Sequence, residues 1–127
     1  MTNNNMYFVA NWKMFGNLSS LYSLNKVFKL TKSKPFTKFR IIYCPPYTLI
    51  SEFVQKTKKN KIIVGAQDCH YVNTVGPFTG SVSANQIKNL GAKYVILGHS
   101  EKRSSGDTNQ IISKKIISAL AENLKVI

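Results

Sequence analysis

Short apolar runs alternate with amphipathic stretches along the chain, and one such pair recurs about every 30 residues. The runs are apolar almost throughout, which is typical of strands that are covered on both faces. We expect strands at 7–10, 39–43, 62–66, 94–97 and from 125 onward. Helical spacing predicts helices at about 19–32, 45–54, 83–90 and 108–123, with breaks at Pro35 and Gly91. This alternation predicts parallel strands joined by right-handed helical crossovers.

Two α/β architectures fit this pattern: a doubly wound open sheet and a (β/α)8 barrel. No GxGxxG or phosphate-loop motif follows the first strand, which weakens the nucleotide-binding form of the open sheet. In both architectures ligands gather where the parallel strands end. Polar residues directly after each strand are therefore the candidates for chemistry.

Composition adds a strong positive charge to this picture. The 127 residues suffice for one domain, or one piece of a larger one, and carry a net charge of +13. Such a balance favours anionic partners, although the lysines are dispersed as on a solvated surface. Cys44 and Cys69 lie in no metal-binding or disulfide pattern, so we expect no metal site and a reducing, cytoplasmic setting. No apolar run approaches the roughly 20 residues of a membrane helix.

Polar and ionisable residues follow the first and fourth strands. Asn11 and Lys13 come after the first strand, and His99 and Glu101 come after the fourth. Taken singly, a lysine there is usually solvated, and a histidine at a strand end more often belongs to a turn or a core. Parallel strands would bring all four residues to one rim, and that convergence favours a site.

Six segments carry a resemblance to a known family: "NWKM" (11–14), "CPPYT" (44–48), "GAQDCHY" (65–71), "PFTG" (77–80), "LGHSEKR" (97–103) and "ALAENLKVI" (119–127). Together, over 7–127, they resemble triosephosphate isomerase. The resemblance implies a (β/α)8 TIM barrel, of which residues 1–127 would form a single partial domain. That domain would be an incomplete half-barrel of about four and a half units, without the C-terminal half.

The resemblance also implies an activity and roles for the four strand-end residues. The family interconverts dihydroxyacetone phosphate and glyceraldehyde 3-phosphate through an enediolate, in glycolysis and gluconeogenesis, without a cofactor. By this likeness His99 is the electrophile, and Lys13 stabilises the oxyanion and attracts the phosphate. Asn11 would contact the substrate and position Lys13, and Glu101 would orient the lysine. Helix N–H groups after His99 would disfavour its imidazolium form.

The long loop at 68–80 is implied to be a dimer contact. In the family this loop enters a pocket beside the partner's active site, and Phe78 and Thr79 match its tip. The likeness thus implies a cytoplasmic homodimer. A surface lid is the alternative for this loop.

The surroundings of the site depart from the family at two places. Ser81 and Lys102 stand where the family usually has a glutamate and an arginine that form an ion pair. The segment "RSSGDTN" (103–109) is one residue shorter than the common family loop. Both differences affect the expected dimer contact and the loop that follows the fourth strand. We expect Gln67 and Asp68 to be structural and to support Lys13 from the neighbouring strand.

The chain offers no match for the family's catalytic base, its closing lid or its last phosphate loops. A complete barrel needs about 250 residues. We therefore expect these residues alone to be inactive and to need a complementary C-terminal half. Two alternatives remain: a non-catalytic basic half-barrel that binds phosphate or nucleic acid, with nucleic acid the less expected ligand, or a decayed remnant. Membrane partners are not expected.

Overall fold

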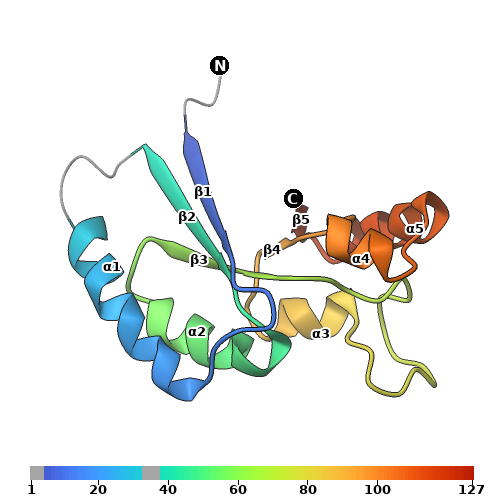
Figure 1. Cartoon of the computed structure of the whole chain (residues 1–127), viewed down its shortest axis with the longest axis horizontal. Coiled ribbons are helices and arrows are strands. Elements are labelled where there is room, and N and C mark those ends of the chain that lie inside the picture. Colours follow the sequence, from blue (N-terminus) through green and yellow to red (C-terminus); the bar gives the residue numbers. More distant parts are fainter. Residues whose placement is uncertain (1–4, 33–37) are drawn as a thin grey trace.

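Five parallel strands form one sheet in the order β1-β2-β3-β4-β5, and the sheet curls into half of a barrel (Figure 1). The computed structural model describes residues 5–32 and 38–127. The strands are β1 (Met6–Asn11), β2 (Phe39–Cys44), β3 (Ile62–Ala66), β4 (Tyr94–Val95) and β5 (Lys125–Val126). All five expected strands are present, with β4 shorter than expected. The expected break at Pro35 lies outside the described residues.

The helices follow the strands in turn, as the alternation predicts. They are η1 (Leu18–Ser23), α1 (Leu24–Thr31), η3 (Tyr47–Leu49), α2 (Ile50–Thr57), α3 (Ala84–Asn89), α4 (Ser100–Ser104) and α5 (Asn109–Ala121). Figure 1 shows α1, α2 and α3 along the same side of the strands. The first helical segment begins at Leu18, one residue earlier than expected, with Asn17 as its N-cap. The α3 helix has Ser83 as its N-cap, and Gly91 follows it with φ +98°.

Side chains from the two faces of the sheet build two apolar clusters. Val64 and Val95 point towards the helices and pack in a cluster that includes Leu24 and Phe53. The opposite face carries a smaller cluster of Ile42, Cys44, Tyr94 and Ile96, with Ile63 packed against it. Because side chains alternate across a strand, neighbouring residues supply different clusters. The second cluster corresponds to the interior of the barrel.

The curl of the sheet brings β2, β3 and β4 close together at Gly65. A Cβ atom at this position would lie 2.8 Å from Sγ of Cys44 and 3.1 Å from Cβ of Tyr94. Only hydrogen fits there without a shift of the neighbours. This close approach sets the spacing of the inner cluster.

The β1 strand lies at one edge of the sheet and is exposed. It pairs with β2, and no strand among the described residues covers its other edge. Met6, Tyr7, Phe8 and Val9 are 41–54% exposed. An apolar strand that is unpaired along one edge favours association with a further chain or segment. This exposure agrees with a half-barrel.

Periodicity gives the buried face of α5 only in part. Ile112 is buried as expected, but Ile117 and Leu120 are 66% and 57% exposed. Lys115 and Ser118 are buried in their place. The burial of Lys115 has an electrostatic reason, since its ammonium group meets two carboxylates beneath the helix. The spacing of apolar residues alone cannot predict such an ion pair.

Among the described residues, no helix combines the length and the apolar character needed to cross a membrane.

Candidate active site

Lys13 and Glu101 meet at the rim where the strands end, although 88 positions separate them in sequence. Lys13 follows β1, and Glu101 lies in the first turn of α4, after β4. Nζ of Lys13 donates to Oε1 of Glu101 at 2.7 Å. Both side chains remain about half exposed, at 49% and 58%. A small anion from solvent can therefore reach the ammonium group.

The backbone of Lys13 is held in an unusual conformation. Its φ is +52°, in the left-handed region that non-glycine residues rarely occupy. The Lys13 N–H donates to Oδ1 of Asn11 at 2.9 Å, and its carbonyl accepts from Nε2 of Gln67 at 2.8 Å. Such a conformation costs about 1–3 kcal/mol and persists where its surroundings fix it, often at functional sites. The same Gln67 amide donates to the Cys44 carbonyl, so β1, β2 and β3 are tied together below the lysine.

Trp12 fixes the same loop from the helix side. Its ring packs edge-on against Phe53 at a centroid distance of 5.0 Å. Gly16, with φ +100°, passes so close that a Cβ there would lie 2.8 Å from the indole ring. Trp12 is thus buried in part while Lys13 itself faces solvent. Its neighbours on both sides therefore restrict the position of the ammonium group.

His99 is the N-cap of α4 and directs its ring at the helix start. Gly98 precedes it with φ +71°, which allows the sharp turn from β4. Nδ1 of His99 accepts a hydrogen bond from the Glu101 N–H at 3.2 Å. An accepting Nδ1 carries a lone pair, so the proton of this tautomer is on Nε2. Nε2–H is then available as a donor to a ligand.

Glu101 links the lysine and the histidine. Its Oε2 lies 3.6 Å from Nδ1 of His99, beyond hydrogen-bond distance, so the shorter N–H contact defines the tautomer. The hydrogen bond from Lys13 lowers the pKa of Glu101, and the positive charge of the lysine acts in the same direction, against an opposing effect of burial. The carboxylate therefore stays ionised at neutral pH and is a weak proton acceptor.

Asp68 does not support Lys13, contrary to expectation. It contacts Nζ of Lys115 at 2.8 and 3.0 Å and Nζ of Lys102 at 3.1 Å. Asp107 holds the other side of Lys115 at 2.6 Å. The family's usual ion pair is absent at Ser81 and Lys102, but Lys102 has a carboxylate partner in Asp68. This cluster joins α4 and α5 to the end of β3.

Lys115 and Asp107 received no assignment from the sequence. The two residues are eight positions apart, a spacing that suits one face of a helix, but no sequence motif marks the pair. Burial would lower the pKa of Lys115, yet its hydrogen bonds to Asp107 and Asp68 outweigh burial and raise it. The lysine is therefore charged although its side chain is only 7% exposed.

The loop between β3 and α3 extends away from the sheet, as Figure 1 shows at the lower right. Inside it, the His70 ring stacks on Tyr71 and approaches Phe78, each at 4.3 Å between centroids. Val75 is 87% exposed, and Thr79 is also exposed. Phe78, one of the two expected tip residues, is thus partly held by its own loop.

The two cysteines are buried and form no disulfide. Burial raises the pKa of each thiol to about 12, so neither is a nucleophile at neutral pH. Within the described ranges, no group of three or more His, Cys, Asp or Glu residues could hold a metal ion. The residues that gather at the rim are suited to polarising a carbonyl oxygen and binding an anion.

Comparison with known proteins identifies the family. The family model described as triosephosphate isomerase matches residues 6–127. The triosephosphate isomerase of Alkaliphilus oremlandii is 36% identical over 119 residues, which are 93% of this chain and 47% of that protein. The enzyme of Zygosaccharomyces bailii is 39% identical over 123 residues, or 95% and 48% of the two chains.

Solved structures agree with the sequence relatives. The crystal structure of triosephosphate isomerase from Bartonella henselae superposes with a TM-score of 0.85 at 32% identity, over 94% of this chain and 49% of that one. The chain thus spans about half the length of the relatives it matches. The five strands and the strand-end motifs all fall within the matched part. The chain belongs to the triosephosphate isomerase family.

Proposed function

We propose that the protein to which this chain contributes interconverts dihydroxyacetone phosphate and glyceraldehyde 3-phosphate. The observation that carries the proposal is that Lys13 and His99 both contact Glu101 at the rim of the half-barrel: the lysine donates to its carboxylate, and the histidine accepts from its backbone N–H. A positive charge and a neutral N–H donor beside each other suit an enediolate, whose oxygen atoms gain negative charge during the reaction. Asn11 fixes the backbone of the lysine and adds a polar group at the same edge.

In this mechanism Lys13 and His99 act on the substrate oxygens. Nε2–H of His99 donates to the carbonyl oxygen and stabilises the charge that develops when the adjacent carbon loses a proton. The ammonium of Lys13 stabilises the same charge and attracts the phosphate dianion. Removal of one such donor typically lowers kcat by about 10²–10³. Glu101 is a positioning residue, since its contacts are with the lysine and the helix start.

The proton acceptor comes from outside these residues. The chain has five acidic residues, and four of them are engaged: Asp68 and Asp107 with Lys115, Glu101 with Lys13, and Glu122 with two amides. The fifth, Glu52, is exposed in α2, on the helix side of the sheet. A positioned base contributes about 10²–10⁴ to the rate. We therefore propose that the 127 residues alone are inactive and that a C-terminal half supplies the base.

The same proposal implies two kinds of partner for this chain. The open edge of β1 and the exposed apolar residues there suit the missing strands of the barrel. The projecting loop, with Phe78 and Thr79, suits a second subunit, so the assembled protein would be a homodimer in the cytoplasm. A role in glycolysis and gluconeogenesis accompanies the reaction.

An assay of three proteins tests the proposal. They are the chain alone, the chain fused to the C-terminal half of the Zygosaccharomyces bailii relative, and that fusion with Lys13→Ala. We expect turnover of glyceraldehyde 3-phosphate by the fusion only, and a loss of about 10²–10³ in kcat with Lys13→Ala. Turnover by the chain alone at the rate of the fusion would refute the missing base. An unaffected Lys13→Ala fusion would refute the site.

A further inference from the structure

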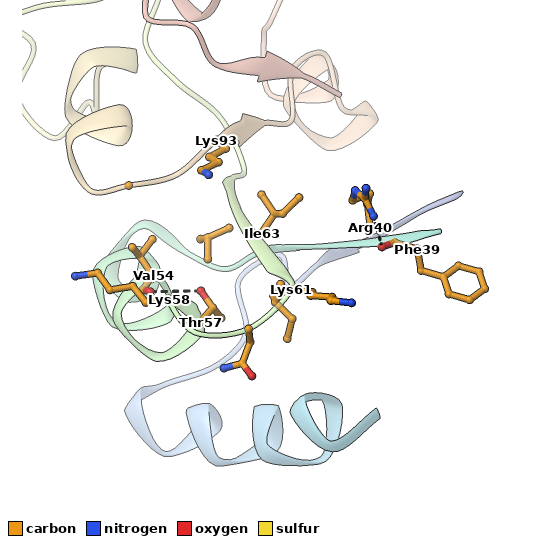
Figure 2. Close-up of a pocket in the computed structure, with 12 residues that line it drawn as sticks. Phe39, Arg40, Val54, Thr57, Lys58, Lys61, Ile63 and Lys93 are labelled. Carbon is orange, nitrogen blue, oxygen red and sulfur yellow. Dashed lines mark hydrogen bonds between the residues drawn. The ribbon is translucent and has the colours of Figure 1, made fainter. Parts of the chain in front are cut away.

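A second pocket lies at the opposite end of the strands from Lys13 and His99. It surrounds the start of β3 and has a volume of about 640 Å³, within the usual range of small-molecule sites of about 300–1,000 Å³. Its walls come from the start of β2, the end of α2 and the segment before β4. Figure 2 shows four basic side chains around the start of β3: Arg40, Lys58, Lys61 and Lys93.

The topology explains why cations collect here. In a parallel β/α sheet, helices end and strands begin at the same end of the sheet. The segment "TKKNKII" (57–63) joins α2 to β3 at this end, and "GAK" (91–93) leads into β4. Lysines separated by some 30 residues in sequence therefore share one pocket. By contrast, Asp68, Glu101 and Asp107 lie at the strand-end rim, where each meets a lysine.

None of the described residues that line this pocket is acidic. In the part of the chain that the structure describes, the ion pairs involve Lys13, His99, Lys102 and Lys115, and none of the pocket lysines. Lys58, Lys61 and Lys93 are exposed and can move towards a ligand. Their positive charges repel one another, and an anion among them would remove that repulsion.

The end of α2 offsets this charge only slightly. The helix closes at Thr57, so its carbonyl groups face the same region with about half a negative charge. The positive charge of four basic side chains is much larger than this partial negative charge. The floor includes Val54, Ile62 and Ile63, and a partly apolar wall strengthens charge interactions because it excludes water.

We propose that this pocket binds a small anion with several phosphate groups. Three exposed ammonium groups can contact phosphates that are separated along one ligand, and the Arg40 guanidinium beside them adds a further positive charge. The pocket does not depend on the rim residues, so this proposal and the proposed isomerase activity can fail separately.

Calorimetric titration of the chain with inorganic tripolyphosphate tests the pocket. The variant Lys61→Gln/Lys93→Gln removes two of its cations, and Lys26→Gln/Lys114→Gln removes two exposed lysines from α1 and α5 as a control of equal charge. Because a charge-assisted hydrogen bond changes affinity by about tenfold or more, we expect the first variant to bind at least about tenfold more weakly. The control should bind within about twofold of the unmodified chain, because screening weakens distant charges.

Three outcomes would overturn the proposal. One is the absence of binding heat near physiological salt. Another is an equal loss in both variants, which would mean that net charge and not the pocket attracts the anion. The third is much tighter binding of a single-stranded oligonucleotide that is lost in the Lys61→Gln/Lys93→Gln variant, which would assign the surface to nucleic acid. Circular dichroism of each variant establishes that the fold is intact.

Discussion

Removal of the Lys115 ammonium should destabilise the fold far more than removal of a surface charge. Its Nζ lies 2.6 Å from Asp107 and 2.8 Å from Asp68, and these carboxylates are only 13% and 17% exposed. Lys115→Met keeps much of the apolar stem but leaves both carboxylates without this cation. Loss of one partner of a buried ion pair costs about 3–5 kcal/mol. Because Asp68 keeps Lys102 at 3.1 Å, we expect the lower end, about 3 kcal/mol.

Urea unfolding measures this loss through the fluorescence of Trp12, the single tryptophan, which packs on Phe53. For a chain of this size the loss corresponds to a fall in Tm of about 10–12 °C. Lys114→Met is the matched control, because Lys114 is exposed and its ammonium group lies 5.8 Å from the Tyr71 ring. It should cost less than about 1 kcal/mol. Equal losses in the two variants would refute a stabilising role for the buried cluster.

Two further predictions concern pH and packing. Burial would lower the pKa of Lys115, but its hydrogen bonds to Asp107 and Asp68 outweigh burial and raise it. The contribution of the lysine to folding stability is therefore complete below its unfolded pKa of about 10.4 and is lost as the pH rises through the folded pKa. The difference in unfolding free energy between the unmodified chain and Lys115→Met should be constant from pH 7 to about 10 and shrink above that; a decline already at pH 8 would contradict this. Gly65→Ala should cost about 1–3 kcal/mol in thermal unfolding, because its Cβ would lie 2.8 Å from Sγ of Cys44. An unchanged Tm would mean that β3 can move aside.

The fold could be predicted largely from the chain itself. Alternating apolar runs and helical spacing gave five strands and the helices between them, and the 62–66 strand was predicted to the residue. These signals are local, since burial of a strand or of one helix face repeats at short intervals. The shortened β4 and the exposed Ile117 and Leu120 on α5 were not foreseen. They depend on what lies beneath each element, which a periodic pattern does not contain.

The candidate site shows the same division more sharply. The sequence alone placed Asn11, Lys13, His99 and Glu101 after strands, and parallel topology requires that such positions share a rim. Only the tertiary structure decided that Lys13 adopts a left-handed backbone and that Glu101 binds its ammonium at 2.7 Å. The hydrogen bond from Gln67 to the Lys13 carbonyl and the contact of Lys13 with Glu101 both join segments that are far apart in the chain.

The buried charges were likewise decided in three dimensions. Asp68 pairs with Lys102 and Lys115 and does not support Lys13. Residue type and spacing determine which groups can ionise and which face of an element they occupy. They do not determine which opposite charge lies within 3 Å, because the energy of a pair depends on distance and burial in the folded chain. The sequence therefore determined which ionisable groups are present and that those after the strands share one rim, and the placement of α4 and α5 beside the segment that follows β3 determined which groups pair.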